Sequence, residues 1–96
     1  MENYRLSKKA DADIENIYEY GIINFGLEQA QSYLLGLYER FENLVDNPRF
    51  GRSAAELARG LRRFEYQSHV IFYEPEDDGV LVVRVLRAEM DHQRHL

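Results

Sequence analysis

Residues Gly60–Glu74, GLRRFEYQSHVIFYE, predict a β-hairpin. Two runs rich in aromatic and β-branched residues, Leu61–Tyr66 and His69–Glu74, are separated by a short polar turn. A third run, Val80–Arg87 (VLVVRVLR), follows a polar segment that ends in glycine, which is typical of a longer hairpin loop. This third run is apolar on both faces, so we expect a strand that is covered on both sides.

The first strand of the hairpin begins with two adjacent arginines, Arg62 and Arg63. Successive side chains of a strand point to opposite faces, so one arginine should face whatever covers the sheet and the other should face away. One interpretation is pairing with Glu56, Glu65 or Glu74 on an exposed sheet edge. The other is a role in binding, and both stay open at this point.

The N-terminal half predicts two amphipathic helices, at about residues 8–25 and 28–46, after a short strand at Tyr4–Leu6. Apolar residues recur at helical spacing in both helices. Ser7 suits the N-cap of the first helix, and Gly26 suits its C-terminal stop. Because so few residues separate the helices, we expect them to form an antiparallel hairpin.

The order β-α-α-β-β-β therefore predicts an α+β fold, in which the helix hairpin packs on a small, mainly antiparallel four-stranded sheet. The 96 residues suit a single domain, residues 1–96. No apolar run approaches the roughly 20 residues that span a bilayer, and the absence of cysteine excludes disulfides and thiolate metal sites. We expect a soluble, cytoplasmic protein with no membrane partner.

Charge is distributed unevenly along the chain. The net charge of −5 argues against broad, non-specific binding to nucleic acid phosphates. Residues 49–63, however, contain five arginines and only one glutamate. We call these arginines the basic rim: Arg49, Arg52, Arg59, Arg62 and Arg63.

Three segments together resemble the ParE branch of the RelE/ParE toxins over essentially the whole chain. They are YRLSKKADADIENIYEY, GLEQAQSYLLGLYERFENLVDNPRFGR and GLRRF…HVIFYE…DGVLVVRVLR…MDHQRHL. The resemblance implies a RelE/ParE-like fold and a bacterial type II toxin that causes growth arrest by inhibiting DNA gyrase. It also implies a ParD-like antitoxin that binds the toxin in a hetero-oligomer, with operator DNA reached only through the antitoxin. No cofactor and no enzymatic activity are implied.

The same superfamily contains ribosome-dependent mRNA endonucleases, so we weighed that alternative from its chemistry. RNA cleavage needs a general base, a general acid and cationic stabilisation of the phosphate. The tail after Arg87, AEMDHQRHL, has no tyrosine, so proton transfer would fall to His69, His92 or His95, none of which stands in the expected aromatic pair. This favours gyrase inhibition, with the endonuclease and a non-toxic, antitoxin-binding relic as alternatives.

The resemblance and the strand order together predict two binding surfaces and no catalytic residues. We expect Arg62 or Arg63 to lie near Arg84 or Arg87 and to share a cationic patch with the tail. Candidates for target binding are Arg62, Arg63, Arg84, Arg87, Met90, Asp91 and Arg94. Deletion of Asp91–Leu96 should then reduce growth arrest and leave folding largely intact. Candidates for antitoxin binding are Tyr18, Phe25, Tyr33, Leu37, Arg49, Arg52 and Arg59.

Two clusters resemble metal sites only superficially. His92 and His95 stand at i and i+3 but lack an evident third ligand. The acidic run from Glu74 to Asp78 lacks the alternating ligand pattern of a calcium loop. We predict no metal site.

Overall fold

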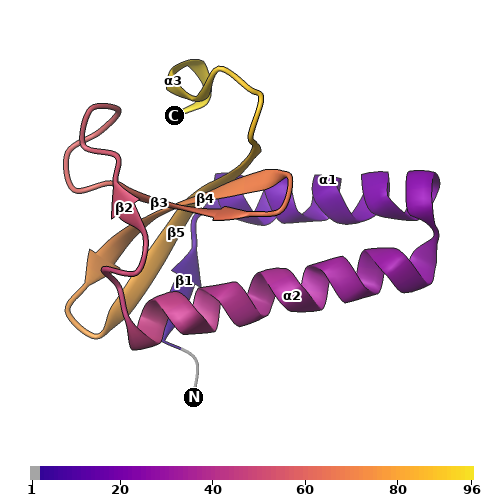
Figure 1. Cartoon of the computed structure of the whole chain (residues 1–96), viewed down its shortest axis with the longest axis horizontal. Coiled ribbons are helices and arrows are strands. Elements are labelled where there is room, and N and C mark those ends of the chain that lie inside the picture. The colour runs from indigo at the N-terminus through magenta and orange to yellow at the C-terminus, as the bar shows by residue number, and fades with distance from the viewer. Residues whose placement is uncertain (1–2) are drawn as a thin grey trace.

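The computed structural model describes residues 3–96, which form one five-stranded sheet with a helix hairpin on one face (Figure 1). The elements in chain order are β1 (Tyr4–Leu6), α1 (Lys8–Phe25), α2 (Leu27–Asp46), β2 (Arg52–Ser53), β3 (Arg62–Tyr66), β4 (His69–Glu76), β5 (Gly79–Arg87) and α3 (His92–His95). The sheet order is β1-β5-β4-β3-β2, with β1 parallel to β5 and the other pairs antiparallel.

The predicted α+β class, helix hairpin and mainly antiparallel sheet are confirmed. The expected count of four strands is wrong, because β2 adds a fifth strand by pairing Arg52 with Arg63 and Ser53 with Arg62. A strand of two residues is too short to produce a periodic pattern in the sequence. The expected longer loop between β4 and β5 is also wrong, since pairing continues to Glu76 and Gly79 and leaves a two-residue turn.

Local sequence signals explain where the helices begin and end. The Ser7 hydroxyl accepts a hydrogen bond from the Ala10 amide at 2.9 Å, which caps α1, and it donates to the Val83 carbonyl at 2.7 Å. Gly26 adopts a φ of 92°, a conformation that L side chains rarely take, and it alone separates α1 from α2. The same serine therefore starts the helix hairpin and ties it to the sheet.

Two apolar layers cover the two faces of the sheet. The helix hairpin buries the larger layer, which includes the fully buried Phe41 and Tyr73. On the opposite face, Phe72 and Leu86 lie in a smaller cluster that is completed by Met90 and Leu96 of the C-terminal segment. The expectation that the last strand is covered on both sides is confirmed, because β5 contributes to both layers and pairs with β1 and β4.

Candidate functional site

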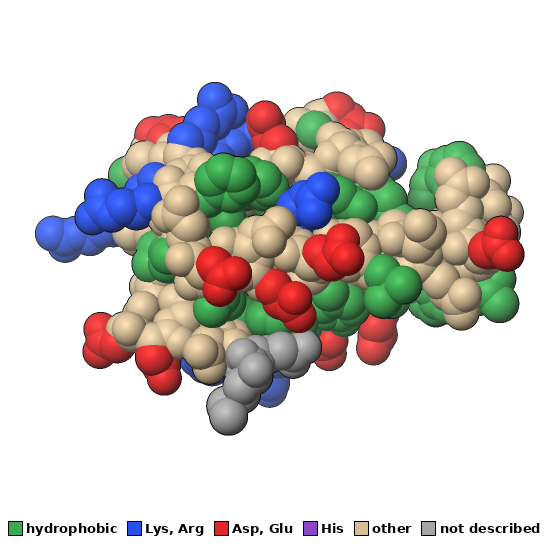
Figure 2. Space-filling view, turned by 60° about the horizontal axis from the view of Figure 1, so that its bottom comes forward, with side chains coloured by type: hydrophobic (Ala, Val, Ile, Leu, Met, Phe, Trp, Pro, Cys, Tyr) green, Lys and Arg blue, Asp and Glu red, His purple; other side chains and the backbone are tan. Residues whose placement is uncertain are grey.

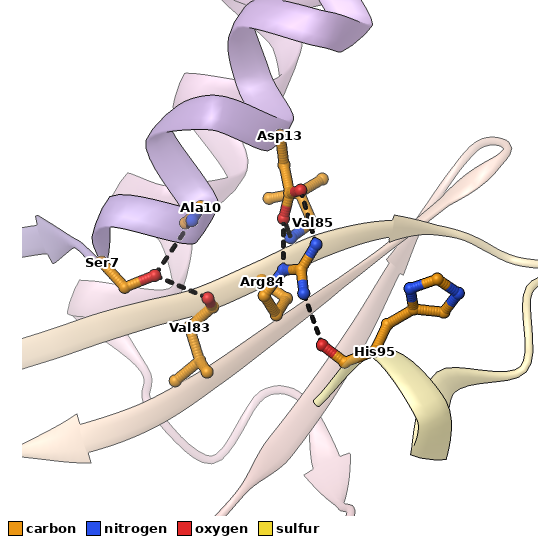
Figure 3. Close-up of polar contacts among 7 residues, drawn as sticks. All are labelled: Ser7, Ala10, Asp13, Val83, Arg84, Val85 and His95. Carbon is orange, nitrogen blue, oxygen red and sulfur yellow. Dashed lines mark hydrogen bonds and ion pairs between the residues drawn. The ribbon is translucent and has the colours of Figure 1, made fainter.

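Strand β5 extends past the end of β1, and α1 lies beside this part of β5 (Figure 3). The Asp13 carboxylate of α1 binds two neighbouring residues of β5 there. Asp13 of α1 accepts hydrogen bonds from the Val85 amide at 3.0 Å and from Arg84 Nε and Nη2, each at 2.8 Å. The two side chains are only 12% and 15% exposed. Arg84 also donates to the carbonyl of His95, so this one guanidinium joins α1, β5 and the C-terminal segment.

A pocket of about 340 Å³ lies beside this ion pair, between α1, the end of β5 and the C-terminal segment. His69 and Arg87, which are paired across β4 and β5, both line it together with Met90. The Tyr33 hydroxyl, from α2, lies 2.6 Å from His69 Nδ1. Burial lowers the pKa of His69 and raises the pKa of Tyr33, so both groups are held neutral near pH 7.

Residues 88–96 are docked on the sheet rather than free. His92 packs edge-on against Phe72 with a centroid separation of 5.0 Å, and its Nε2 lies 3.0 Å from the Arg87 carbonyl oxygen. Met90 and Leu96 pack against the apolar cluster of the same face. This packing predicts that removing Asp91–Leu96 lowers stability, in contrast to the expectation from the sequence that folding stays largely intact.

The paired arginines that open β3 both make internal contacts. Arg62 Nη2 donates to the Gly51 carbonyl at 2.5 Å, which ties β3 to the loop before β2. The guanidinium of Arg63 lies 5.4 Å from the centre of the Phe72 ring, and its side chain is 17% exposed. Both residues therefore hold the sheet and its covering segments together.

Strand β4 lies between these arginines and the arginines of β5. Arg63 and Arg84 are both in register with Phe72, one on each side of it, and Arg84 is bound to Asp13. Arg87 and Arg94 are exposed near the C-terminal segment, and three residues of the basic rim, Arg49, Arg52 and Arg59, are exposed elsewhere. Arg5, Lys8 and Lys9 near the N-terminus are also exposed.

Comparison with known proteins supplies the family. The sequence model described as "ParE toxin of type II toxin-antitoxin system, parDE" matches residues 4–92. The chain belongs to this ParE toxin family. Toxin ParE1 of Mycobacterium tuberculosis is 37% identical over 94 residues, covering 97% of this chain and 96% of that protein. Toxin ParE1 of Caulobacter vibrioides is 36% identical over 96 residues, covering 100% and 99%.

A solved structure agrees with the fold of this ParE toxin. A chain of the chromosomal ParDE toxin–antitoxin system from P. aeruginosa superimposes with a TM-score of 0.76 at 23% identity, covering 93% of this chain and 98% of that chain. Within residues 3–96 of the toxin, no helix has the length and apolar character that crossing a membrane requires. The same residues hold no cluster of three or more histidine, aspartate or glutamate side chains placed for a metal ion.

The expected antitoxin-binding residues of the ParE toxin are placed very differently. Leu37 is fully buried beneath the helix hairpin, so its assignment to a binding surface is wrong. Its helical spacing is the same for a core face and a partner face, which is why the pattern was ambiguous. Tyr18 and Tyr33 are half-buried, whereas Phe25 is exposed. The rim residues Arg49, Arg52 and Arg59 are exposed.

Sequence reasoning missed two features of the ParE toxin. Phe50 is 57% exposed and stacks on Phe64 with a centroid separation of 5.1 Å, beside the basic rim. The Tyr33–His69 pair joins α2 to β4 across 36 positions of the sequence. Neither contact has a local signal in the sequence. Phe50 is a single phenylalanine before a glycine, and Tyr33 is too distant from His69 in the chain for a local pattern to link them.

The stability of this ParE toxin should depend on pH through His69. Burial, with a smaller contribution from Arg87, lowers its pKa below the ordinary value of 6.5, although Glu89 and Asp13 act in the opposite direction. The unfolded chain then binds more protons, so the free energy of unfolding should fall as pH drops below about 6.5 and level off below the folded pKa. His69→Gln, which can still bond Tyr33, should lack this component in urea unfolding between about pH 5 and 7.5. Identical pH profiles would contradict the expectation.

Proposed function

We propose that this ParE toxin inhibits DNA gyrase by binding it, without catalysis, and that a cognate ParD-like antitoxin holds it inactive in the cytoplasm. The observation that carries the proposal is the family match over residues 4–92, together with relatives that align along the whole chain. The ParE branch, which the sequence resembles, implies gyrase as the target.

The end of β5 and the C-terminal segment provide the surface that we assign to the target. Arg87 and Arg94 are exposed, as is Asp91, and Met90 is half-buried beside them. Hydrogen bonds from His92 to the Arg87 carbonyl and from Arg84 to the His95 carbonyl hold the short helix α3 against β5. The backbone that bears these two exposed guanidinium groups is therefore held in place. Guanidinium groups bind carboxylates and phosphates, so they can contact carboxylates of gyrase or phosphates of the DNA bound to it.

A supercoiling assay with purified gyrase tests this assignment. The wild-type toxin should inhibit supercoiling, and Arg87→Ala with Arg94→Ala should raise the half-inhibitory concentration by about tenfold, the effect of losing one to two charge-assisted hydrogen bonds. Arg5→Ala is the matched control, because Arg5 is also exposed but pairs with Glu76 and lies beside Leu81, toward the opposite end of β5 from Arg87. A wild-type toxin that leaves gyrase unaffected would refute the proposed target.

The basic rim, with Phe50 beside it, is the surface that we assign to the antitoxin. Exposed Arg49 and Arg52 offer charge to acidic side chains, and Phe50 offers an apolar anchor. A disordered segment that folds on binding can use both chemistries, since apolar side chains anchor it and acidic groups pair with arginines. The antitoxin segment should therefore be acidic and apolar.

The salt dependence of the toxin–antitoxin complex tests this second surface. Raising salt from 0.1 M to 1 M shortens the Debye length from about 10 Å to 3 Å, which screens rim pairs but not apolar contacts. We expect the complex to weaken without dissociating, and Phe50→Ala to weaken it at both salt concentrations, whereas Arg52→Ala should act only at low salt. Complete separation of the wild-type complex by moderate salt would show that the apolar contact is absent.

One observation favours the endonuclease as a second candidate. His69 has an aromatic partner in Tyr33 and shares a pocket with Arg87, so a proton-transfer group and a cation stand together. Cleavage of mRNA in a ribosome-dependent translation assay, lost in His69→Gln, would establish that activity. Absence of growth arrest on expression without the antitoxin would instead identify the non-toxic relic.

A further inference from the structure

The turn of the helix hairpin presents an uncovered apolar surface. Among the residues that the structure describes, five of the seven exposed large hydrophobic side chains lie between positions 20 and 27. They are Tyr20, Ile22, Ile23, Phe25 and Leu27. We call residues 19–28 the hairpin tip. The ends of α1 and α2 extend beyond the edge of the sheet, and the tip forms an apolar knob apart from the main body (Figures 1 and 2).

Close packing and a tight turn hold the hairpin tip in one conformation. Gly26 makes the reversal in a single residue, with φ of 92°. Gly21 lies so close to α2 that a Cβ there would meet the Ala30 Cβ at 3.1 Å, which shows how tightly the helix ends pack. Tyr20 and Phe25 are arranged edge to face with a centroid separation of 6.4 Å. Side chains that are fixed in advance lose less conformational entropy when a partner covers them.

Every charged residue that the helix hairpin carries around its tip is acidic, while Arg87 of β5 lines the same pocket as Tyr20. Residues 10–39 contain six acidic residues and no lysine or arginine. Glu19 and Glu28 flank the apolar side chains directly and are exposed. Nucleic acid phosphates and anionic lipids would be repelled by this field, and a second copy that docks tip to tip would bring like charges together. The complementary occupant is a protein surface that combines basic and apolar side chains.

We propose that the hairpin tip docks on such a basic, apolar protein surface of the toxin's target. The inference rests on the proposed function, and it adds a contact to the one at Arg87 and Arg94. An antitoxin segment with acidic groups suits the basic rim but would be repelled by Glu19 and Glu28. The rim and the tip lie at opposite ends of the molecule (Figures 1 and 2). A protein that binds DNA carries lysine and arginine side chains where the phosphates bind. Such a positively charged surface is complementary to the negative charge of the hairpin tip.

The test uses the full-length toxin and purified gyrase. Ile23→Ser with Phe25→Ser removes side chains that are 82% and 60% exposed, and Leu35→Ser is the matched control, because Leu35 is 66% exposed on α2 away from the tip. We expect the tip variant to bind gyrase at least tenfold more weakly, as for a buried anchor, and the control to bind within about twofold of wild type. Melting temperature and antitoxin affinity should stay unchanged in both variants. Glu19→Lys with Glu28→Lys should also weaken gyrase binding.

When wild-type toxin binds gyrase, three outcomes would overturn the inference. The first is a tip variant that binds gyrase as tightly as wild type. The second is a tip variant that keeps gyrase binding and loses antitoxin affinity, which would assign the tip to the antitoxin. The third is concentration-dependent self-association of the wild-type toxin that the tip variant abolishes. If wild-type toxin binds no gyrase, the proposed target fails by itself, and growth arrest then decides: arrest lost only in the tip variant supports the tip, and arrest retained overturns it.

Discussion

Replacing Arg84 by alanine should lower the free energy of unfolding by about 3 kcal/mol, because it leaves the Asp13 carboxylate buried with only the Val85 amide as partner. It also removes the hydrogen bond that holds the His95 carbonyl. For a chain of this size, the melting temperature should fall by roughly 10 to 20 °C. Urea and thermal unfolding measure both quantities.

Two variants make this expectation specific to the buried ion pair. Arg87→Ala removes an exposed arginine of the same strand and should change the free energy of unfolding by less than about 0.5 kcal/mol. Asp13→Asn combined with Arg84→Met should recover part of the lost stability, since no uncompensated charge remains. If Arg84→Ala kept full stability and lost growth arrest, Arg84 would contact the target instead of supporting the fold.

Deletion of Asp91–Leu96 should destabilise the toxin by roughly 2 to 3 kcal/mol, which is the cost of uncovering part of the second apolar layer. Leu96 and His92 would no longer cover the side of the sheet that carries Phe72. Arg84 would also lose its carbonyl partner. Growth arrest should decrease together with the melting temperature, measured on the same purified variant.

Two substitutions separate the contribution of the C-terminal segment to stability from the contribution of its exposed side chains to gyrase binding. Arg94→Ala and Asp91→Ala change exposed side chains only, so the melting temperature should stay within a few degrees of wild type. Reduced gyrase inhibition at unchanged stability would then belong to the exposed face of the segment. Wild-type stability after the full deletion would show that the segment contributes no packing energy.

The sequence by itself determined the two long helices, four of the five strands and the order of these elements along the chain. Hydrophobic periodicity located both helices, Ser7 and Gly26 marked their limits, and the apolar run Val80–Arg87 predicted a strand with both faces covered. These features depend on neighbours within a few positions, so local pattern is sufficient to specify them. The order and spacing of short motifs along the whole chain likewise indicated the ParE toxin family.

Only the tertiary structure decided what the charged and apolar side chains do. Arg62, Arg63 and Arg84 looked alike as surface cations, yet each is bound to a backbone carbonyl, an aromatic ring or a buried carboxylate. Leu37 and Phe25 share helical spacing, but one lies over the sheet and the other at the hairpin tip, beyond the sheet edge. The physical reason is that ion pairing and burial depend on contacts up to 71 positions apart, such as Asp13 with Arg84, and these exist only once the helix hairpin has packed on the sheet.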